Sequence, residues 1–580
     1  MRTSLLGKYW KFREHDEEQV RDLSDALGVS SLTAAVLRHR KITSREEGRI
    51  YLNAGLSDLS NPLEIPGIVP AAERMVAALE RKDRICIFGD YDVDGVTATA
   101  LLVRILNRLG ADVTCLLPNR LKDGYGLHRA VIPRIVETGA KLLITVDNGI
   151  SAREEIAQIR KAGIDVIVTD HHEPPEVLPE TPYLVNPKME PARAGHFAML
   201  SGVGLAFALL VAVRALLREK NSDGRRDLPN LREVLDLVAL GTIGDVVPLV
   251  GENRILVRHG LAEIGRSRNR GIRALVNAAG IRGSVVTPGQ VGFALAPRIN
   301  AAGRLGDAML ALRMLVSDDP EEVEELAAML NTENLRRREI EKKIFAEALE
   351  RMEREGSEGK VIVLASEDWH PGVIGIVASR MVERFYRPTI LIARKNGMGV
   401  GSGRSISGFS LYRALEAGGE YLQGFGGHEV AAGLTVAWER IPAFRDAVNH
   451  YAEETLDAET LVPSISIDDS LVPEQVTPEL LGELEKLKPF GIGNPEPVFQ
   501  LSGVRPQSVC IVGEAHLRFQ VPCGKGLLNV IGFNLGKYAD PLTAAPSSDL
   551  LCHLRFNDFN GKRSVQAVLV DIRPEVHQGA

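Results

Sequence analysis

The sequence has few cysteines, few aromatic residues and no long apolar run. Five of its 580 residues are cysteines and no two form a CxxC pair, which excludes a zinc ribbon and a disulfide framework. The longest apolar stretch, residues 202–213, is far shorter than the roughly 20 residues that cross a bilayer. The N-terminus also lacks the apolar run of a signal peptide. We therefore predict a cytoplasmic protein with no membrane-spanning segment.

The chain also lacks an excess of positive charge. It has 69 Lys and Arg against 76 Asp and Glu, a net charge of −7. Phosphate binding depends on Lys and Arg, so this balance argues against a protein that coats nucleic acid. An enzyme that acts on nucleic acid stays compatible with it, because metal-binding carboxylates lower the net charge. The length and the ordinary apolar content of 45% predict a folded protein of about three or four domains.

The clearest pattern lies between residues 84 and 168. Apolar runs alternate there with helical segments, which predicts a parallel sheet with helices on its faces. The predicted strands are Arg84–Gly89, Ala111–Leu117, Lys141–Val146 and Asp165–Val168, and the predicted helices are Val96–Leu109 and Ala152–Lys161. Residues 202–217 and 231–241 are expected to be buried helices, whereas residues 1–75 are expected to be irregular.

A long charged helix separates this sheet from the rest of the chain. It starts at Asp319-Pro320 and extends about 36 residues, or roughly 54 Å at 1.5 Å per residue. It is either a surface helix with a solvated face or a rigid strut between two lobes, and we favour the strut. Strand patterns at Val361–Ser366 and Thr389–Ala393 predict a second α/β lobe that ends near residue 450. From Ser464, short strands between Gly and Pro turns predict a small β-barrel or sandwich.

Acidic and histidine side chains gather where the predicted strands end. Three strands and one buried helix are each followed by such residues: Asp90, Asp92 and Asp94; Asp147; Asp170, His171 and His172; and Asp245. Because ligands bind beyond the carboxyl ends of parallel strands, these side chains should share one site. Their carboxylates would repel one another unless cations neutralised them. Oxygen and imidazole donors without thiolate favour Mn²⁺ or Mg²⁺, and two such ions roughly 3.5–4 Å apart suit phosphoryl displacement.

Each of these motifs also has a purely structural interpretation. Asp is common in loops, Asp147-Asn148-Gly149 is ordinary turn chemistry, and an adjacent His pair can cap a loop. The prediction of a metal site therefore rests on the occurrence of all of them together at successive strand ends.

The motifs DYDVDG, VDNG, TDHH and GDVVPL, in that order, resemble those of the DHH phosphoesterases. PRINAAGR, GGHEVAAG and KPFGIGNPEPVF narrow the resemblance to the bacterial RecJ-type exonucleases, from about residue 70 to the C-terminus. The fold that this implies is α/β: a DHH phosphoesterase lobe with a parallel sheet, a long connecting helix, a DHH-associated α/β lobe and a C-terminal OB-like β-barrel. The boundaries that we expect are 1–75 for an N-terminal segment, then 76–315, 316–357, 358–455 and 456–580 for these four parts.

The resemblance also implies a role for each candidate residue. The expected ligands of two cations, Mn²⁺ or Mg²⁺, are Asp92, Asp94, Asp147 as the bridge, His171 and Asp245. Asp90 would replace a metal-binding His that many relatives carry just upstream, where this chain has Phe88. Asp170 would orient His171. His172 would contact the substrate or the leaving group, or else make a structural hydrogen bond.

Further residues are implied to bind the substrate. They are Arg120, Tyr125, Ser402 and Arg404 around the terminal 5′ phosphate, His428 beside them, and Arg304 at the backbone near the scissile bond. In the OB-like barrel we expect backbone electrostatics to dominate, because aromatic residues make up only 5% of the chain. Phe519, Phe533 and Phe556 are expected in the barrel core.

The implied activity is two-metal hydrolysis by a 5′-to-3′ exonuclease that degrades single-stranded DNA to nucleoside 5′-monophosphates in recombination and repair. A single-strand-binding protein and a RecQ-type helicase are the implied partners of a monomeric enzyme. Two alternatives stay open. A DHH phosphodiesterase on short oligoribonucleotides or cyclic dinucleotides would need no strand-binding barrel, and a non-catalytic DNA-binding replication scaffold would have little need for every metal acid.

Overall fold

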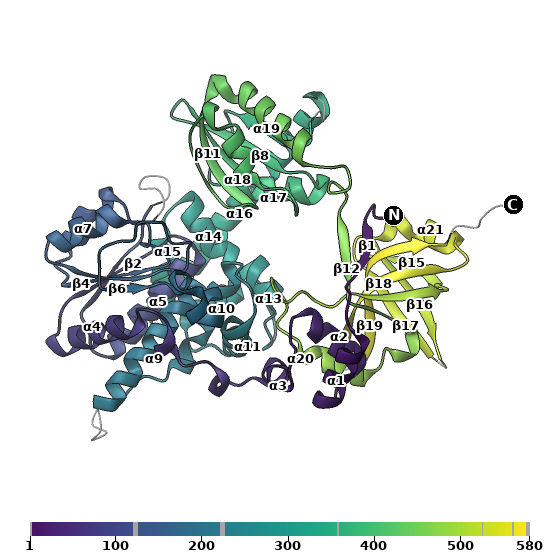
Figure 1. The fold of residues 1–580 in the computed structure, drawn as a ribbon, viewed down its shortest axis with the longest axis horizontal. Helices are drawn as coiled ribbons and strands as arrows, with labels where there is room; N and C mark the ends of the chain where they lie inside the picture. Colours follow the sequence, from purple (N-terminus) through teal and green to yellow (C-terminus); the bar gives the residue numbers. More distant parts are fainter. Residues whose placement is uncertain are drawn as a thin grey trace. The chain divides into compact units, whose positions relative to one another are not determined.

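The computed structural model describes residues 3–119, 126–220, 227–355, 359–524, 526–559 and 562–575. These residues form two units, each assembled from separate stretches of the chain (Figure 1). The first unit contains Met1–Leu52, Arg338–Leu487 and Glu496–Ala580, and the second contains Asn53–Arg337 and Lys488–Pro495.

The second unit is built on a five-stranded parallel sheet with the strand order β3-β2-β4-β5-β6. Its strands are β2 Ile85–Gly89, β3 Val113–Leu116, β4 Leu142–Val146, β5 Asp165–Thr169 and β6 Tyr183–Val185. Four of them lie where apolar runs predicted strands, so the predicted parallel sheet is confirmed. Strand β6 was not predicted, because three residues are too few to show a pattern.

Helices cover both faces of this sheet. One face carries α4 Ile68–Arg81, α5 Val93–Arg108, α9 Gly202–Lys220 and α10 Leu235–Gly244, and the other carries α6 Ile132–Glu137 and α7 Arg153–Lys161. Alternation along β2 serves both cores: Ile85 and Ile87 pack on the α5 side, whereas Cys86 and Phe88 pack on the α7 side. Burial on both faces explains why the strand is apolar throughout.

The remaining helices of this unit follow α10 or precede α9. They are α8 Pro191–Ala194, α11 Gly251–Ile264, α12 Arg270–Ala278, α13 Pro288–Gln290, the π-helical turn η7 Val291–Leu295, α14 Ala296–Leu305 and α15 Met309–Val316. No single helix of the described ranges is long and apolar enough to cross a membrane, although Pro191–Met199 and Gly202–Lys220, bent by 113°, pass that test together by length and composition.

The long helix α16, Pro320–Glu355, has 36 residues, as predicted. The boundary between the two units falls inside it, between Arg337 and Arg338. Val323 and Leu330 are buried in the core of the second unit, and Ile344 is buried in the first. The helix therefore connects the two units and adds side chains to the interior of each, so it is not merely a solvated surface helix.

The first unit contains sheets of two, five and seven strands. The five-stranded sheet has the order β10-β11-β9-β8-β7, with strands β7 Ile362–Ser366, β8 Thr389–Lys395, β9 Met398–Arg404, β10 Leu422–Gly427 and β11 Ala431–Ala437. Its helices are α17 Ile374–Phe385, α18 Leu411–Ala417 and α19 Ile441–Thr455. Only β7 and β8 run parallel, so this is a mixed sheet.

The seven-stranded sheet has the order β13-β14-β18-β19-β17-β16-β15. Its strands are β13 Asp469–Leu471, β14 Phe499–Val504, β15 Gln507–Val512, β16 His516–Cys523, β17 Gly526–Gly532, β18 Ser548–Phe559 and β19 Lys562–Pro574. Short helices α20 Pro478–Lys486 and α21 Ala539–Ala544 accompany it. This is the β-rich C-terminal part that the Gly- and Pro-punctuated pattern predicted.

The prediction that residues 1–75 are irregular is wrong. They contain strand β1 Tyr9–Phe12, helices α1 Glu17–Leu27, α2 Ser31–His39 and α3 Arg45–Asn53, and the start of α4. Strand β1 pairs in parallel with β12 Ser464–Ile467, and Trp10 Nε1 donates a hydrogen bond of 2.9 Å to Asp571 Oδ2. The helices are short, and their starts were marked only by the capping residues Asp16 and Ser30.

Candidate metal centre

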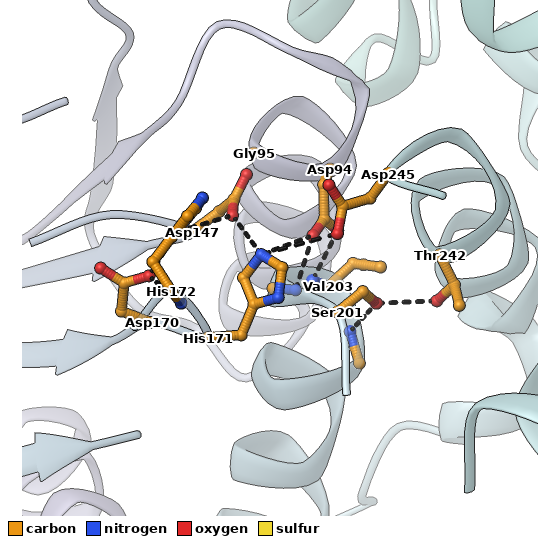
Figure 2. Close-up of polar contacts among 12 residues, drawn as sticks. Asp94, Gly95, Asp147, Asp170, His171, His172, Ser201, Val203, Thr242 and Asp245 are labelled. Atoms are coloured by element: carbon orange, nitrogen blue, oxygen red, sulfur yellow. Dashed lines mark hydrogen bonds and ion pairs between the residues drawn. The ribbon is translucent and has the colours of Figure 1, made fainter. Parts of the chain in front are cut away.

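The acidic motifs meet at the carboxyl ends of β2, β4 and β5, as expected for a parallel sheet (Figure 2). Asp90 follows β2, Asp147 follows β4, and Asp170 and His171 follow β5. Asp245 joins them from the C-terminal end of α10. Sequence motifs that lie up to 155 residues apart therefore form one cluster.

The first motif is held by the start of two helices. Asp92 is the N-cap of α5, and its Oδ1 accepts the backbone N–H groups of Asp94 at 3.0 Å and Gly95 at 3.2 Å. Asp94 is fully buried, and its two oxygens accept the N–H groups of Gly202 at 2.6 Å and Val203 at 2.8 Å. The start of α9 thus fixes the Asp94 carboxylate.

Residue 202 has to be glycine for this arrangement. A Cβ atom there would lie 2.7 Å from Asp147 Cβ and 3.0 Å from Asp94 Oδ2. Sequence reasoning missed Gly202 and Val203 as site residues. The signal that could have found them is the small-residue sequence Ser201–Gly204 at the start of a predicted buried helix, because exposed N–H groups at a helix start bind carboxylates.

A constrained turn presents Asp147. Its backbone has φ of 62°, in the left-handed region that Asp tolerates better than most residues. Asn148 Nδ2 donates hydrogen bonds to the carbonyls of Phe88 at 3.3 Å and Val146 at 2.9 Å, which ties the turn to both β2 and β4. The sequence assigned Asn148 only a structural role in a turn, and in the structure this turn orients the Asp147 side chain toward the cluster.

His171 lies at the centre of the cluster. Its Nε2 is 3.0 Å from Asp147 Oδ1, 3.5 Å from Asp245 Oδ2 and 3.8 Å from Asp94 Oδ2. A hydrogen bond to the backbone carbonyl of Leu200 holds the ring. Burial, followed by the neighbouring His172, lowers the pKa of His171 to about 3, so the ring is neutral and can offer a nitrogen lone pair to a cation.

The carboxylates of the cluster lie close to one another, and this raises the pKa values of three of them. Burial, then the charges of Asp245 and Asp92, raises the pKa of Asp94 well above its usual value. The pKa of Asp147 is raised in the same way, mainly by burial and next by the charge of Asp94. Burial and the charge of Asp92 raise the pKa of Asp245 to about 7. These acids oppose one another's ionisation, as expected where cations would normally neutralise them.

The donor atoms fit divalent cations. Asp147 Oδ1, His171 Nε2 and Asp245 Oδ2 are buried with no hydrogen-bond partner among the residues that the structure describes. Donor atoms within 4.8 Å of one another form three groups: Asp90, Asp92 and Asp147; Asp94, His171 and Asp245; and Asp147, His171 and His172. Asp147 and His171 each belong to two of these groups, so the groups overlap and form one continuous cluster. Oxygen and imidazole donors without thiolate suit Mn²⁺ or Mg²⁺.

Asp170 does not orient His171, contrary to our expectation. Its Oδ1 lies 2.8 Å from His172 Nδ1 and accepts the His172 backbone N–H at 3.1 Å, while its Oδ2 accepts the N–H of Ile150 at 2.9 Å. The bond to the His172 N–H forms an Asx turn, and the same oxygen also contacts the His172 ring. Despite burial, these hydrogen bonds lower the pKa of Asp170 and raise that of His172.

Comparison with known proteins identifies the family of this chain. The family models for the DHH family N-terminal domain, the DHHA1 domain and the RecJ OB domain match residues 84–242, 358–454 and 467–571. The single-stranded-DNA-specific exonuclease RecJ of Bacillus subtilis is 36% identical over 97% of this chain and 70% of its own length. That of Dickeya dadantii is 41% identical over 88% of this chain and 90% of its own length. The chain belongs to the RecJ family.

Solved RecJ structures share the fold. RecJ of Thermus thermophilus in complex with Mn²⁺ has a TM-score of 0.83 and 35% identity, covering 99% of this chain and 81% of that protein. The complex of the same protein with Mg²⁺ has a TM-score of 0.77 and 34% identity, covering 98% and 79%. The α/β fold with a DHH lobe and a C-terminal OB domain, expected from the motifs, is therefore confirmed.

The other predicted substrate residues that the structure describes are placed by their own elements. Ser402 and Arg404 are on β9, with Arg404 Nη1 3.2 Å from Ser402 Oγ, and a Cβ on Gly375 of α17 would lie 2.8 Å from that Oγ. His428 is exposed in the turn between β10 and β11. Arg304 is in the last turn of α14. Arg120 and Tyr125 lie outside the described residues.

The three phenylalanines of the OB part differ in burial. Phe519 is buried in the core, as expected. Phe533, however, is 55% exposed and meets only the edge of the His516 ring, so the prediction that it is a core residue is wrong. It follows the end of β17, where the alternation that buries strand residues no longer applies. Phe556 is half-buried beneath the Arg563 guanidinium, 3.9 Å from the ring centre.

Proposed function

We propose that this protein is a metal-dependent 5′-to-3′ exonuclease that degrades single-stranded DNA to nucleoside 5′-monophosphates in DNA recombination and repair. The observation that carries the proposal is the convergence of buried ligand atoms from Asp147, His171 and Asp245 that contact one another and have no hydrogen-bond partner among the described residues. It is supported by RecJ relatives that are named single-stranded-DNA-specific exonucleases. Nothing in the described structure favours a short-substrate phosphodiesterase or a non-catalytic scaffold.

The cofactors in this proposal are two divalent cations, Mn²⁺ or Mg²⁺, the ions of the two solved Thermus thermophilus complexes. Their ligands would be Asp90, Asp92, Asp94, Asp147, His171 and Asp245, with Asp147 shared. When bound, such ions polarise a phosphodiester and offset the negative charge that develops on its oxygens.

The chain's own residues prepare the site for that charge. The N–H groups of Gly202 and Val203 hold Asp94, and the Asn148 hydrogen bonds hold the Asp147 turn, so neither acid has to reorganise. The His172 side chain is 40% exposed, and its Nδ1 lies 2.8 Å from Asp170 Oδ1, so a partly exposed ring is held at the edge of the cluster where a substrate oxygen would lie. Because Asp170 raises the pKa of His172, this ring can donate a hydrogen bond or proton to the leaving group.

The finer parts of the proposal concern capture of the strand. Ser402, Arg404 and His428, with Arg120, Tyr125 and Arg304, would bind its phosphates, and Arg404 offers a guanidinium fork beside a hydroxyl. We also propose the domain division 1–75, 76–315, 316–357, 358–455 and 456–580. A monomeric cytoplasmic enzyme that works with a single-strand-binding protein and a RecQ-type helicase completes the proposal.

The test uses a single-stranded DNA oligomer labelled at either end, with Mn²⁺ or Mg²⁺ and with its duplex as control. We expect mononucleotides first from the 5′ label and a spared duplex. Cleavage confined to pieces of two to five nucleotides would support the short-substrate phosphodiesterase instead. Binding without turnover in either metal would support the scaffold.

A further inference from the structure

Three large apolar side chains around the end of α10 are exposed. Val246, Phe293 and Ile492 have exposed fractions of 58%, 82% and 52%, and all belong to the second unit. We refer to these three residues as the apolar rim. Single exposed apolar residues are ordinary. These three, however, are all tied to one stretch of chain, the end of α10 and the residues that follow it.

Two of these side chains, Val246 and Phe293, lie on segments next to Asp245 in sequence or in space. Val246 follows Asp245 directly. A Cβ on Gly244, on the other side of Asp245, would lie 3.0 Å from Ala296 Cβ. A Cβ on Gly292 would lie 3.8 Å from Ile243 Cγ2. Phe293, between Gly292 and Ala296, therefore sits on a turn that packs against the end of α10, and both η7 and α14 contact α10.

The third side chain arrives from a distant part of the sequence. Leu249, three residues after Val246, donates its backbone N–H to the carbonyl of Ile492 at 2.7 Å. Gly493 packs on the same stretch, since a Cβ there would lie 3.2 Å from Pro248 Cβ. The segment Lys488–Pro495 is thus attached just beyond Asp245 and Val246, with Ile492 facing solvent.

The backbone is irregular at two of the three positions. Val246 has φ of 67°, a left-handed conformation that is unfavourable for a β-branched residue. Phe293 lies in the π-helical turn η7, which starts after the capping box of Thr287 and Gln290. Both irregularities cost free energy and are typical of functional sites. Here they accompany apolar side chains held in water beside a metal ligand.

We propose that the apolar rim is a contact surface for the nucleobases of the strand whose terminal linkage lies at the metal centre. This rests on the proposed function. A single strand exposes the flat apolar faces of its bases, on which a phenyl ring stacks and against which Val and Ile side chains pack, whatever the base. A duplex keeps those faces stacked inside. The rim would therefore contribute to the preference for single strands without reading the sequence.

Binding to two 5′-phosphorylated single strands of equal length tests the proposal. One is natural, and the other has abasic sites in its first six nucleotides, so that it keeps the phosphates and loses the bases. Affinity is measured by fluorescence anisotropy in chelator, where no cleavage occurs. We expect wild type to prefer the natural strand by about fivefold or more, the effect of one good stacking contact.

Phe293→Ala should reduce this preference to less than about twofold while leaving the affinity for the abasic strand unchanged, and Phe293→Trp should retain it. Phe12→Ala is the matched control, because Phe12 is also an exposed phenylalanine, at 53%, but belongs to the first unit. It should preserve the preference.

Three results would overturn the proposal: no preference in wild type, a preference that survives Phe293→Ala, or an equal loss in Phe12→Ala. A preference that survives would point to a protein partner as the occupant of the rim. Cleavage of the natural strand with Mn²⁺ in the same preparations tests the proposed function separately. If the wild-type protein prefers the natural strand but never cleaves it, the proposed exonuclease function is refuted, whereas base contact by the apolar rim is still supported.

Discussion

The metal centre and a cluster in the first unit both place a buried histidine against a buried aspartate, with opposite electrostatics. In the first unit, Asp468 Oδ1 lies 3.2 Å from His39 Nδ1, 3.5 Å from Arg40 Nη1 and 3.7 Å from Arg13 Nε. Its Oδ2 accepts the N–H of Val498 at 3.0 Å. Although burial opposes it, the His39 hydrogen bond and the Arg40 charge lower the pKa of Asp468.

In the metal centre, no ion pair among the described residues joins the same residue types to an arginine. His171 meets Asp94, Asp147 and Asp245, and burial together with the charges of neighbouring acids, Asp92 among them, raises the pKa of all three. A buried His–Asp pair is therefore not by itself a metal site. An excess of buried acid over positive charge is what distinguishes the site that needs a cation from the cluster that is complete without one.

Removal of Asp147 should have the largest effect. Asp147→Ala should lower exonuclease turnover by about 10³-fold or more, because loss of a residue that only supports a metal ligand already costs 10- to 100-fold. DNA binding in chelator should persist. Asp112→Ala is the control, since Asp112 is an exposed acid at the amino end of β3 that pairs with Arg84 at 2.7 Å. Substantial residual turnover in Asp147→Ala would remove this residue from the bridging role.

Removal of the charge from Asp468 should instead affect stability. Asp468→Asn leaves Arg40 and His39 without their shared carboxylate, and breaking a buried pair in this way costs about 3 kcal/mol. Chemical denaturation should show this as a lower unfolding midpoint in metal-free protein. Unchanged stability would mean that the cluster of His39, Arg40 and Asp468 does not fasten residues 1–52 to the C-terminal part.

The same Asp-to-Asn substitution at Asp147 should change the free energy of unfolding in the opposite direction. Asp147→Asn removes one of several mutually repelling buried charges, so in chelator it should raise the free energy of unfolding by about 1 kcal/mol. Wild type should recover more than this difference when Mn²⁺ is added, and the variant should gain little. A destabilising effect in chelator would show that Asp147 is satisfied without metal.

Much of the metal centre could be predicted from the sequence, because three of its acids directly follow predicted strands. Asp90, Asp147 and Asp170 each follow an apolar run, so their meeting at one sheet edge follows from parallel pairing alone. Asp245 follows a helix instead, so parallel pairing does not account for its position, and its role as a metal ligand came from the resemblance to a known family.

Other features depend on tertiary contacts that no local pattern encodes. Gly202 and Val203 bind Asp94 across 108 residues, and His39 meets Asp468 across 429. The partner of Asp170 was predicted wrongly because the choice between His171 and His172 is made by backbone geometry within three residues. Phe533 was misplaced since its exposure depends on where β17 ends.

The smallest expected effect is a difference in how stability depends on pH. Burial and Asp92 raise the pKa of Asp245 from 3.8 to about 7, so the folded chain keeps a proton that the unfolded chain has lost. In chelator, the free energy of unfolding should therefore fall as the pH rises through this window. The lowered pKa of Asp468 has the opposite sign, because its contribution is present above the ordinary pKa and is lost as the pH falls.

Urea denaturation in chelator at several pH values between about 4 and 7.5 separates the two contributions. Asp245→Asn should flatten the fall in stability across this window, whereas Asp468→Asn should lower the whole curve and keep its slope there. Saturating Mn²⁺ should also remove the fall in wild type, because a bound cation holds the carboxylates ionised. An equal slope in wild type and Asp245→Asn would mean that Asp245 is not strained by its neighbours, and the contrast between the two clusters would then rest on Asp94 and Asp147 alone.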